Sequence, residues 1–415
     1  MDLRTVFSTH VWNFPSFLCL FLEAMLAYYL LRREKLLKSH KSRGAAILLL
    51  GLAFYLRYRF LYIETSDYTN FLEPWVKYFA ENGGFRALRN SIGNYNVPYL
   101  YFLAAFSYLP IQPLYPIKLL SCLADVFLAW GVARLCRVGS RRPSEGTRRG
   151  LFYAVLFLPT VMLNGAAWGQ CDSLYAAFAV WAVARGNEGH PIESFALAAL
   201  SFAFKLQAVF FLPVYLLFLQ RKNFKWIHVL AFPATYLLAV LPAVLLGRPF
   251  LSTLLLYPAN IRSVGSALNY NSPSLFSLLP NLPSSDTASR LAIAAAFLAM
   301  LIVLLRGAAS KSRAPDDRII VSAAAILTLV IPFFLPHMHE RYFFLADIFT
   351  LASLPDRPLF AAPSAVLVQF GSLLGYYAYL NQRFLCPMSW GGLAMALAIV
   401  LMGIRYHRFC RNPKS

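Results

Sequence analysis

Long apolar stretches alternate with short polar ones along nearly the whole chain. The apolar stretches run for roughly 15–22 residues, and about 20 helical residues are needed to cross a bilayer core about 30 Å thick. A membrane β-barrel would instead show strands in which apolar and polar residues alternate, and this chain does not show them. The pattern therefore predicts an all-α integral membrane protein.

The apolar stretches predict about 13 membrane crossings in a single polytopic domain over residues 1–415, with the N-terminus outside. Two of them, 191–204 and 207–220, are short, and we expect a broken helical pair that meets at Lys205. Irregular backbone at that depth is tolerated only where it is buried in protein or lines a cavity. The crossings are expected near 11–31, 44–63, 117–136, 150–166, 172–186, 191–204, 207–220, 226–246, 290–306, 319–335, 343–355, 359–380 and 389–405.

Two large loops are expected on the outer side, at 64–115 and 247–289. The stretch 97–109 in the first loop is apolar but cannot be a single crossing, so we interpret it as an interfacial or re-entrant piece. The same loop is expected to carry an interfacial helix over about 70–82, because apolar side chains recur there at helical spacing. They are Phe71, Leu72, Trp75, Val76 and Phe79.

Composition and charge support a membrane protein with cytoplasmic basic loops. The chain has 59% hydrophobic and 13% charged residues, far from the average of soluble domains. Its net charge of +20 could suit nucleic acid, but the basic residues gather in short loops, as expected of cytoplasmic loops. No nucleic-acid partner is therefore expected, and the C-terminus should be cytoplasmic. The loops are 32–43, 134–149, 221–225, 306–318 and 405–414.

A polar island follows the stretch 44–63 and contains Asp67. Its carboxylate should lie at the membrane surface, where it could serve as a catalytic base. Aspartate is also favoured at helix starts, so Asp67 could simply cap the helix over 70–82. On these residues alone the two interpretations are about even.

Other unusual polar residues are expected on the same face of the membrane. Ionisable groups at membrane depth are costly, which makes each of them a functional hypothesis. Arg57 and Arg59 could join them, although we favour snorkelling to the interface for at least one of the two. The groups are Asn94-Tyr95, Trp168-Gly-Gln170-Cys-Asp172, Lys205-Leu-Gln207 and His337-Met-His339-Glu340-Arg341-Tyr342.

Several of these residues also have ordinary structural explanations. Taken singly, Trp168 is better explained by an aromatic belt, and Asp172 by the capping of the next helix. Arg341 and Lys205 are harder to explain in this way. A guanidinium that grips two oxygens and an ammonium that acts as a point charge suit a phosphate that arrives attached to a lipid.

Metal binding has little support in the sequence. His337 and His339 are spaced like a ligand pair, but no third ligand stands beside them. The six cysteines show no Cys-x-x-Cys spacing, and most lie within apolar stretches. Neither a metal site nor a disulfide framework is expected.

Four motifs occur in order along the chain: Thr-Ser-Asp67-Tyr, Trp168-Gly-Gln170-Cys-Asp172-Ser-Leu-Tyr, Phe-Lys205-Leu-Gln207-Ala and His337-Met-His339-Glu340-Arg341-Tyr342. Together they resemble the bacterial membrane proteins related to the eukaryotic second GPI mannosyltransferase. More distantly they are similar to the dolichyl-phosphate-glucose glucosyltransferases. The resemblance covers about 44–380 and implies a GT-C fold.

The resemblance also implies an activity and a location. It implies an inverting glycosyltransferase that moves a hexose, with mannose as the first expectation, from a polyprenyl-phosphate donor to a glycan or glycolipid acceptor. The protein would lie in a bacterial plasma membrane, with its active site facing the exterior. A lipid-linked sugar transporter or flippase is the alternative from another class, and a GT-C oligosaccharide ligase differs only in its acceptor.

The resemblance assigns roles to residues. Asp67 matches the catalytic base. Two features depart from the family pattern: the stretch 11–31 is additional, and Asp67 has no second aspartate beside it, so we expect no essential metal and no cofactor. Residues assigned to the donor phosphate or sugar are His337, His339, Glu340, Arg341, Lys205 and Gln207. Independently of the resemblance, we expect Trp168, Gln170, Asp172, Asn94 and Tyr95 on the acceptor side of the site or in support of it.

Overall fold

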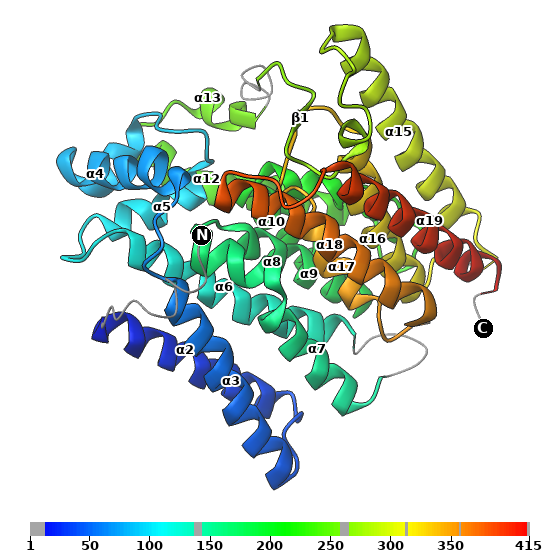
Figure 1. Cartoon of the computed structure of the whole chain (residues 1–415), viewed down its shortest axis with the longest axis horizontal. Coiled ribbons are helices and arrows are strands. Elements are labelled where there is room, and N and C mark those ends of the chain that lie inside the picture. Colours follow the sequence, from blue (N-terminus) through cyan, green and yellow to red (C-terminus); the bar gives the residue numbers. More distant parts are fainter. Residues whose placement is uncertain (1–12, 137–142, 258–264, 312–313, 357, 413–415) are drawn as a thin grey trace.

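The computed structural model describes residues 13–136, 143–257, 265–311, 314–356 and 358–412. This part of the chain is almost entirely helical, as the apolar pattern predicts (Figure 1). Seven of its helices are long and apolar enough to cross a membrane, and an eighth crossing results if the pair Glu145–Phe157 and Pro159–Trp168, bent by 46°, is one span. The all-α membrane protein is therefore confirmed, whereas the figure of about 13 crossings stays a prediction.

The first half of the chain begins with a helical pair and continues through a polar loop into the centre of the molecule. Each stretch expected to cross the membrane falls on helical structure, although several helices are shorter than a span. The helices are α2 (Phe14–Arg33), α3 (His40–Phe60), α4 (Glu73–Glu81), α5 (Val97–Phe106), α6 (Leu114–Leu135), α7 (Glu145–Phe157), α8 (Pro159–Met162), α9 (Asp172–Asn187), α10 (Pro191–Phe204) and α11 (Tyr215–Phe218).

The second half contains longer peripheral helices and one short pair of strands. Strands β1 and β2 pair in parallel, with Asn269 opposite Met338 and Tyr270 opposite His339, and so join the second expected outer loop to the His337–Tyr342 segment. The elements are α12 (Ala231–Leu245), α13 (Phe250–Leu254), β1 (Asn269–Tyr270), α15 (Asp286–Ala308), α16 (Asp317–Phe334), β2 (Met338–His339), α17 (Phe344–Ala352), α18 (Pro358–Asn381) and α19 (Ser389–Arg411).

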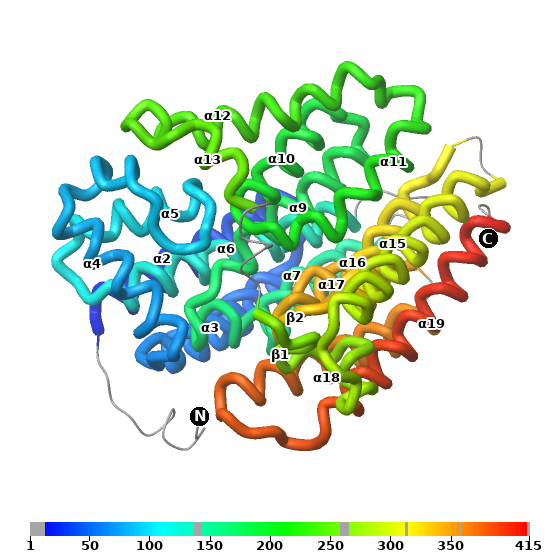
Figure 2. The backbone as a smooth tube through the Cα atoms, turned by 90° about the horizontal axis from the view of Figure 1, so that it is seen from above, coloured from blue at the N-terminus to red at the C-terminus, as the bar shows by residue number. Residues whose placement is uncertain are grey.

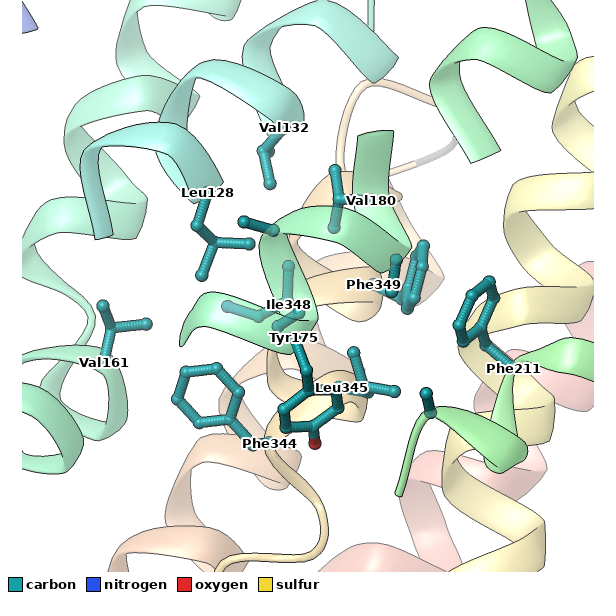
Figure 3. Packing of buried hydrophobic residues seen from close by; sticks show 14 of the residues in the cluster. Leu128, Val132, Val161, Tyr175, Val180, Phe211, Phe344, Leu345, Ile348 and Phe349 are labelled. Atoms are coloured by element: carbon teal, nitrogen blue, oxygen red, sulfur yellow. The ribbon is translucent and has the colours of Figure 1, made fainter. Parts of the chain in front are cut away.

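Helix α17 lies at the core of the molecule, and all nine of its residues are buried. It packs against α6, α9, α16 and α18. Figure 3 shows Phe344, Leu345, Ile348 and Phe349 of α17 among side chains from α6, α8 and α9. Seven of its nine residues are apolar, which suits a position that protein surrounds on every side, and Asp347 and Thr350 are the two polar exceptions. Helix α12 lies at the periphery in Figure 2 and α15 at the periphery in Figure 1, and most residues of both helices are not buried.

The loop 64–115, which is expected on the outer side, contains the two expected helices, with one difference. Helix α5 spans ten residues, about 15 Å and half of a bilayer core. Helix α4 begins at Glu73, after a π-helical turn over Tyr68–Leu72. Leu72, Val76 and Phe79 are buried, and Phe71 is 51% exposed. The regular helix begins about three residues later than the expected 70–82, because Phe71 and Leu72 belong to the π-helical turn.

The break expected at Lys205 is present. Helix α10 ends at Phe204, Lys205 adopts an extended backbone with φ −154° and ψ 135°, and a 3-10 helix follows over Leu206–Phe210. The extended residue turns the Lys205 side chain away from the axis of α10. The broken pair is therefore confirmed, and it places a cationic side chain at the junction.

Candidate active site

Asp67 is the point at which three distant segments of the chain meet. Its Oδ2 atom accepts hydrogen bonds from Trp168 Nε1 at 2.9 Å and from Gln170 Nε2 at 2.6 Å. The Nη1 atom of Arg341 lies 3.8 Å from the same oxygen. The carboxylate is about one-fifth exposed, so it is held by protein on one side and open on another.

The side chain of Asp67 does not cap a helix. It precedes the π-helical turn and makes no capping hydrogen bond, and its own backbone N–H donates to Tyr379 Oη at 3.0 Å. The same tyrosine hydroxyl is 2.8 Å from Ser66 Oγ. The capping interpretation of Asp67 is therefore wrong. The backbone around Asp67 is fixed by helix α18, which leaves the carboxylate available for other contacts.

Trp168 and Gln170 come from the turn that joins a π-helical segment, Leu163–Trp168, to α9. Trp168 is fully buried and stacks on Tyr379 with ring centroids 3.9 Å apart. An aromatic-belt residue would lie at the membrane surface, so that interpretation is wrong for Trp168. Gln170 also accepts a hydrogen bond from Tyr95 Oη at 3.0 Å, which orients its amide toward Asp67. The carboxylate is thus held by an ordered pair of donors.

Asp172 forms the second carboxylate of the site. It is buried and forms an ion pair with Lys205, which comes from the break after α10. Asn164 Nδ2 donates to Asp172 Oδ2 at 2.7 Å, and Arg341 Nε lies 4.0 Å from that oxygen. Asp172 is the first residue of α9 and Cys171 occupies its N-cap, with no side-chain cap present. The capping interpretation of Asp172 is therefore wrong as well.

Arg341 stands among three carboxylates. Its Nη1 atom donates to Glu340 Oε1 at 3.0 Å, and Asp67 and Asp172 lie within 4.0 Å of the guanidinium. Burial alone would lower the pKa of Arg341, but Glu340 and the other anionic neighbours raise the pKa well above its usual value. The guanidinium also lies over the Trp168 ring at 5.2 Å, a cation–π geometry. Arg341 is therefore charged and held in a fixed orientation.

One donor of Arg341 is unused. Its Nε atom is buried and makes no hydrogen bond to any residue that the structure describes. A buried donor without a partner is costly, by about 1–3 kcal/mol. Such a group at the centre of a charged cluster calls for a functional or structural explanation.

The histidines predicted to assist Arg341 lie at the edge of the site. His339 stacks on Tyr270 of β1 with ring centroids 4.7 Å apart, and its Nδ1 is 3.8 Å from Glu340 Oε2. Burial raises the pKa of Glu340, but His339 and Arg341 outweigh it and hold the pKa below its usual value. His337 instead has a positive φ of 62°, and its ring contacts Ala267 O. Its geometry indicates a structural role away from the carboxylates.

Gln207, Tyr95 and Asn94 differ in how close they lie to the cluster. Gln207 is buried beside Tyr342, and its Oε1 makes no hydrogen bond within the described part of the chain. Tyr95 bonds Gln170, and Lys205 Nζ lies 5.9 Å from the centre of its ring. Asn94 is exposed on the loop before α5. Gln207 and Tyr95 therefore belong to the wall of the site, whereas Asn94 lies on its outer surface.

Arg57 occupies a layer beneath the site instead of snorkelling. It is fully buried, and its Nε and Nη2 atoms both donate to Asp125 Oδ2, at 2.9 and 2.8 Å. Asp125 also accepts a hydrogen bond from Ser173, the residue after Asp172. This network links α3, α6 and α9. It fixes α3, which precedes Asp67 in the chain, relative to α9, which begins at Asp172.

Sequence reasoning missed Asn164, Tyr376 and Tyr379. Asn164 joins Tyr376 Oη, at 2.9 Å, to Asp172, while Tyr379 holds the backbone of Asp67. The tyrosines stand in a long apolar helix, where core packing is the usual role of an aromatic residue. Asn164 is a polar residue in an apolar stretch, and that alone could have marked it.

A metal centre has no support among the residues that the structure describes, which contain no group of three His, Cys, Asp or Glu side chains suited to hold an ion. His337 and His339 contact Ala267 O and Tyr270, respectively, so they do not act as a pair. The carboxylates of Asp67, Asp172 and Glu340 are each engaged by cationic or amide donors.

The fold and the site define a helical membrane protein with a carboxylate held beside an arginine, an arrangement that suits group transfer. A comparison with family models identifies the family. The model of glycosyltransferase family 87 matches residues 94–335, more than half of the chain. The protein belongs to this family of GT-C-like membrane glycosyltransferases, so the predicted transferase class is confirmed. A comparison with curated proteins finds no match.

The matched range covers only part of the site. It includes Tyr95, Trp168, Asp172 and Lys205, whereas Asp67 and the segment 337–342 lie outside it. The family assignment therefore supports glycosyl transfer without assigning a role to Asp67 or Arg341. Their roles depend on the geometry.

Proposed function

We propose that the protein is an inverting glycosyltransferase in which Asp67 removes the proton from the acceptor hydroxyl. The observation that carries this proposal is the fixed carboxylate beside a cation: Trp168 and Gln170 hold Asp67 Oδ2, and Arg341 lies 3.8 Å away. Inversion by single displacement requires one base and a cationic group that stabilises the leaving phosphate. Because both hydrogen bonds go to Oδ2, we assign Oδ1 to the acceptor hydroxyl.

Arg341 is the principal ligand that we propose for the donor phosphate. Lys205 is already neutralised by its ion pair with Asp172, whereas Arg341 has a buried Nε without a partner. A phosphate oxygen at Nε would satisfy that donor through a charge-assisted hydrogen bond. Lys205 then contributes a point charge from the second layer. The unpartnered Oε1 of Gln207 is suited to accept a hydrogen bond from a sugar hydroxyl.

The net charge of the cluster does not favour a substrate that binds through its negative charge alone. Asp67, Asp172 and Glu340 face Lys205 and Arg341, which makes three carboxylates against two cations. Such a site does not attract free anions strongly. A substrate must therefore gain its binding free energy elsewhere, and a polyprenyl chain in the bilayer would provide it.

The finer assignments follow from the resemblance. We propose a polyprenyl-phosphate hexose donor, with mannose first, a glycan or glycolipid acceptor, and a relationship to the second GPI mannosyltransferase. We place the site on the outer face of a bacterial plasma membrane, with a cytoplasmic C-terminus, on the basis of the basic loops. Membership of a glycosyltransferase family argues against a transporter or flippase, while an oligosaccharide ligase remains the alternative acceptor chemistry.

The test is to incubate the purified protein with labelled polyprenyl-phosphate mannose or polyprenyl-phosphate glucose and measure product and hydrolysed donor. We expect mannose to be transferred or released, and Asp67→Asn to abolish the signal. Consumption of glucose alone would overturn the assignment of the sugar. If neither donor is consumed while a lipid-linked oligosaccharide is, the ligase alternative holds.

A further inference from the structure

A cleft lies at the ends of α6, α9 and α10 that are remote from the candidate active site. Asp172 and Lys205 stand at the start of α9 and the end of α10, whereas Arg185 and Glu193 stand at the opposite ends of these helices. The 16 residues of α9 span about 24 Å. The cleft has a volume of about 610 Å³, within the range of small-molecule sites. Nothing in the proposed reaction uses it.

The walls of the cleft are built in two layers. On each of α6, α9 and α10, a charged residue and a large apolar residue stand four positions apart, with the apolar residue one helical turn deeper in the cleft. Residues four apart share a helix face, so both members of each pair line the cleft. Trp130 and Trp181 meet with ring centroids 4.5 Å apart, and Phe127 extends this aromatic surface as an exposed side chain. The three pairs that line the cleft are Arg134 with Trp130, Arg185 with Trp181, and Glu193 with Leu197.

Most of the cations in the charged layer are held by carboxylates. Arg134 pairs with Glu34 and Glu188, and Arg148 donates to Glu34 at 2.9 Å. Burial raises the pKa of Glu34, but hydrogen bonds from Trp130 and Arg148 outweigh it and lower the pKa. Glu34 therefore remains ionised and keeps these arginines in place.

Two cations in the cleft have no such partner. Arg33 and Lys35 line it from the end of α2, and neither forms an ion pair with any residue in the described part of the chain. Arg33 instead lies 5.6 Å from the centre of the Trp130 ring. Lys35 has a positive φ of 58°, a conformation rare for a residue with a side chain. Both cations are exposed and stand above the aromatic layer.

We propose that this cleft binds the phosphate of an anionic glycerophospholipid, with Arg33 and Lys35 contacting the headgroup and an acyl chain lying over Trp181, Trp130 and Phe127. Charge complementarity identifies the headgroup, because the two unpaired ammonium and guanidinium groups are the donors that a phosphodiester requires. The aromatic layer one turn deeper distinguishes a lipid from a free phosphate. Tryptophan at the level of the headgroups is typical of a membrane interface.

The experiment is native mass spectrometry of the delipidated, full-length protein with added dioleoylphosphatidylglycerol. The test variant is Arg33→Ala with Lys35→Ala. The control, Lys222→Ala with Lys225→Ala, removes the same charge from exposed lysines in the loop after α11. We take the contribution of a basic residue to the affinity for anionic lipid, about fivefold, as the contribution of each direct headgroup contact, and Lys222 and Lys225 are not among the residues that line the cleft. We therefore expect roughly twenty-five-fold weaker binding in the test variant and little change in the control.

Two further arms separate the possible ligands. Inorganic phosphate at millimolar concentration should not displace the lipid, because it cannot use the aromatic layer, and dioleoylglycerol should not bind, because it lacks the phosphate. Equal lipid retention by the test and control variants, or displacement by inorganic phosphate, would overturn the proposal. Arg33, Lys35, Lys222 and Lys225 are all exposed, so their replacement should change the stability little. A melting temperature near that of the wild type would confirm that each variant is folded.

Discussion

Arg341 Nη1 lies 3.8 Å from Asp67 Oδ2, although the two residues come from opposite ends of the chain. Asp67 follows α3 and Arg341 follows β2, and Trp168 lies against both, donating to the carboxylate and offering its ring face to the guanidinium. The relative position of a base and a phosphate ligand decides where the acceptor and the anomeric carbon must lie. This contact therefore defines the centre of the proposed reaction.

Asp67→Asn tests the proposed base. Asparagine keeps the volume and an oxygen that can accept from Trp168 Nε1 and Gln170 Nε2, but it loses the proton acceptor. We expect turnover to fall by about 10²- to 10⁴-fold, with the donor KM and the melting temperature near those of the wild type. Asp67→Glu should restore little activity, because displacement of the carboxylate by about 1 Å costs roughly a hundredfold.

Glu64→Gln is the matched control for the base. Glu64 is an exposed carboxylate of the same loop, and it accepts a hydrogen bond from Gln112 at 2.9 Å instead of contacting Arg341. Its replacement should leave turnover within about twofold, as expected of surface substitutions away from the site. If Glu64→Gln is inactive and Asp67→Asn retains turnover, the base is Glu64.

Arg341→Lys tests the phosphate ligand. Lysine keeps the positive charge but loses the planar fork, including the Nε donor that has no partner in the described structure. The donor KM should rise about ten- to a hundredfold, measured with initial rates over a range of donor concentrations. Arg383→Lys, on an exposed arginine that donates to Tyr377 Oη, is the control. An unchanged donor KM in Arg341→Lys would exclude its assignment.

The length of the apolar stretches was sufficient to predict that they form helices, but not how deeply each helix is buried in the protein. The stretch 343–355 was expected to cross the membrane and is α17, yet only the structure shows that all nine of its residues are buried. Burial depends on neighbours from distant segments, which periodicity within one stretch cannot reveal. The start of α4 was predicted about three residues too early for a local reason, since a π-helical turn over Tyr68–Leu72 precedes it.

The polar residues of the site could be found in the sequence, because charge in a membrane protein is rare, but their pairing could not. Lys205 was assigned to a phosphate, and the structure pairs it with Asp172. His337 was grouped with His339 by spacing, whereas its positive φ directs the ring to Ala267. Nothing in the sequence marked Tyr379, because its contact with Asp67 exists only when α18 packs against the loop that carries Asp67.

Removal of metal tests the proposed independence from cofactors. The three carboxylates of the site are engaged by Lys205, Arg341 and the amide of Gln170, so a cation would have to displace these donors. We expect turnover to be unchanged after dialysis against EDTA, measured with the donor that the wild type consumes. Loss of activity that Mg²⁺ or Mn²⁺ restores would show that a metal participates.

The orientation of the protein can be tested by labelling single cysteines. Glu81 is exposed at the end of α4, on the loop that carries Asp67, and Lys222 is exposed in the loop after α11. The loop after α11 lies at the end of α9 that is remote from the site. Arg221 Nη1 in this loop donates to Oδ1 of Asn187, the last residue of α9, at 3.2 Å. In a background with Cys19→Ser and Cys386→Ser, the two positions should therefore report opposite faces of the membrane.

We expect Glu81→Cys to react with a membrane-impermeant maleimide in intact cells, and Lys222→Cys to react only after the membrane is permeabilised. The physical reason is that basic loops are retained on the cytoplasmic side, and residues 221–225 contain three basic residues, Arg221, Lys222 and Lys225. If only Lys222→Cys were labelled in intact cells, the orientation of the protein would be the reverse of the proposed one, with Asp67 on the cytoplasmic side. Labelling of both would show that α9 does not separate the two faces.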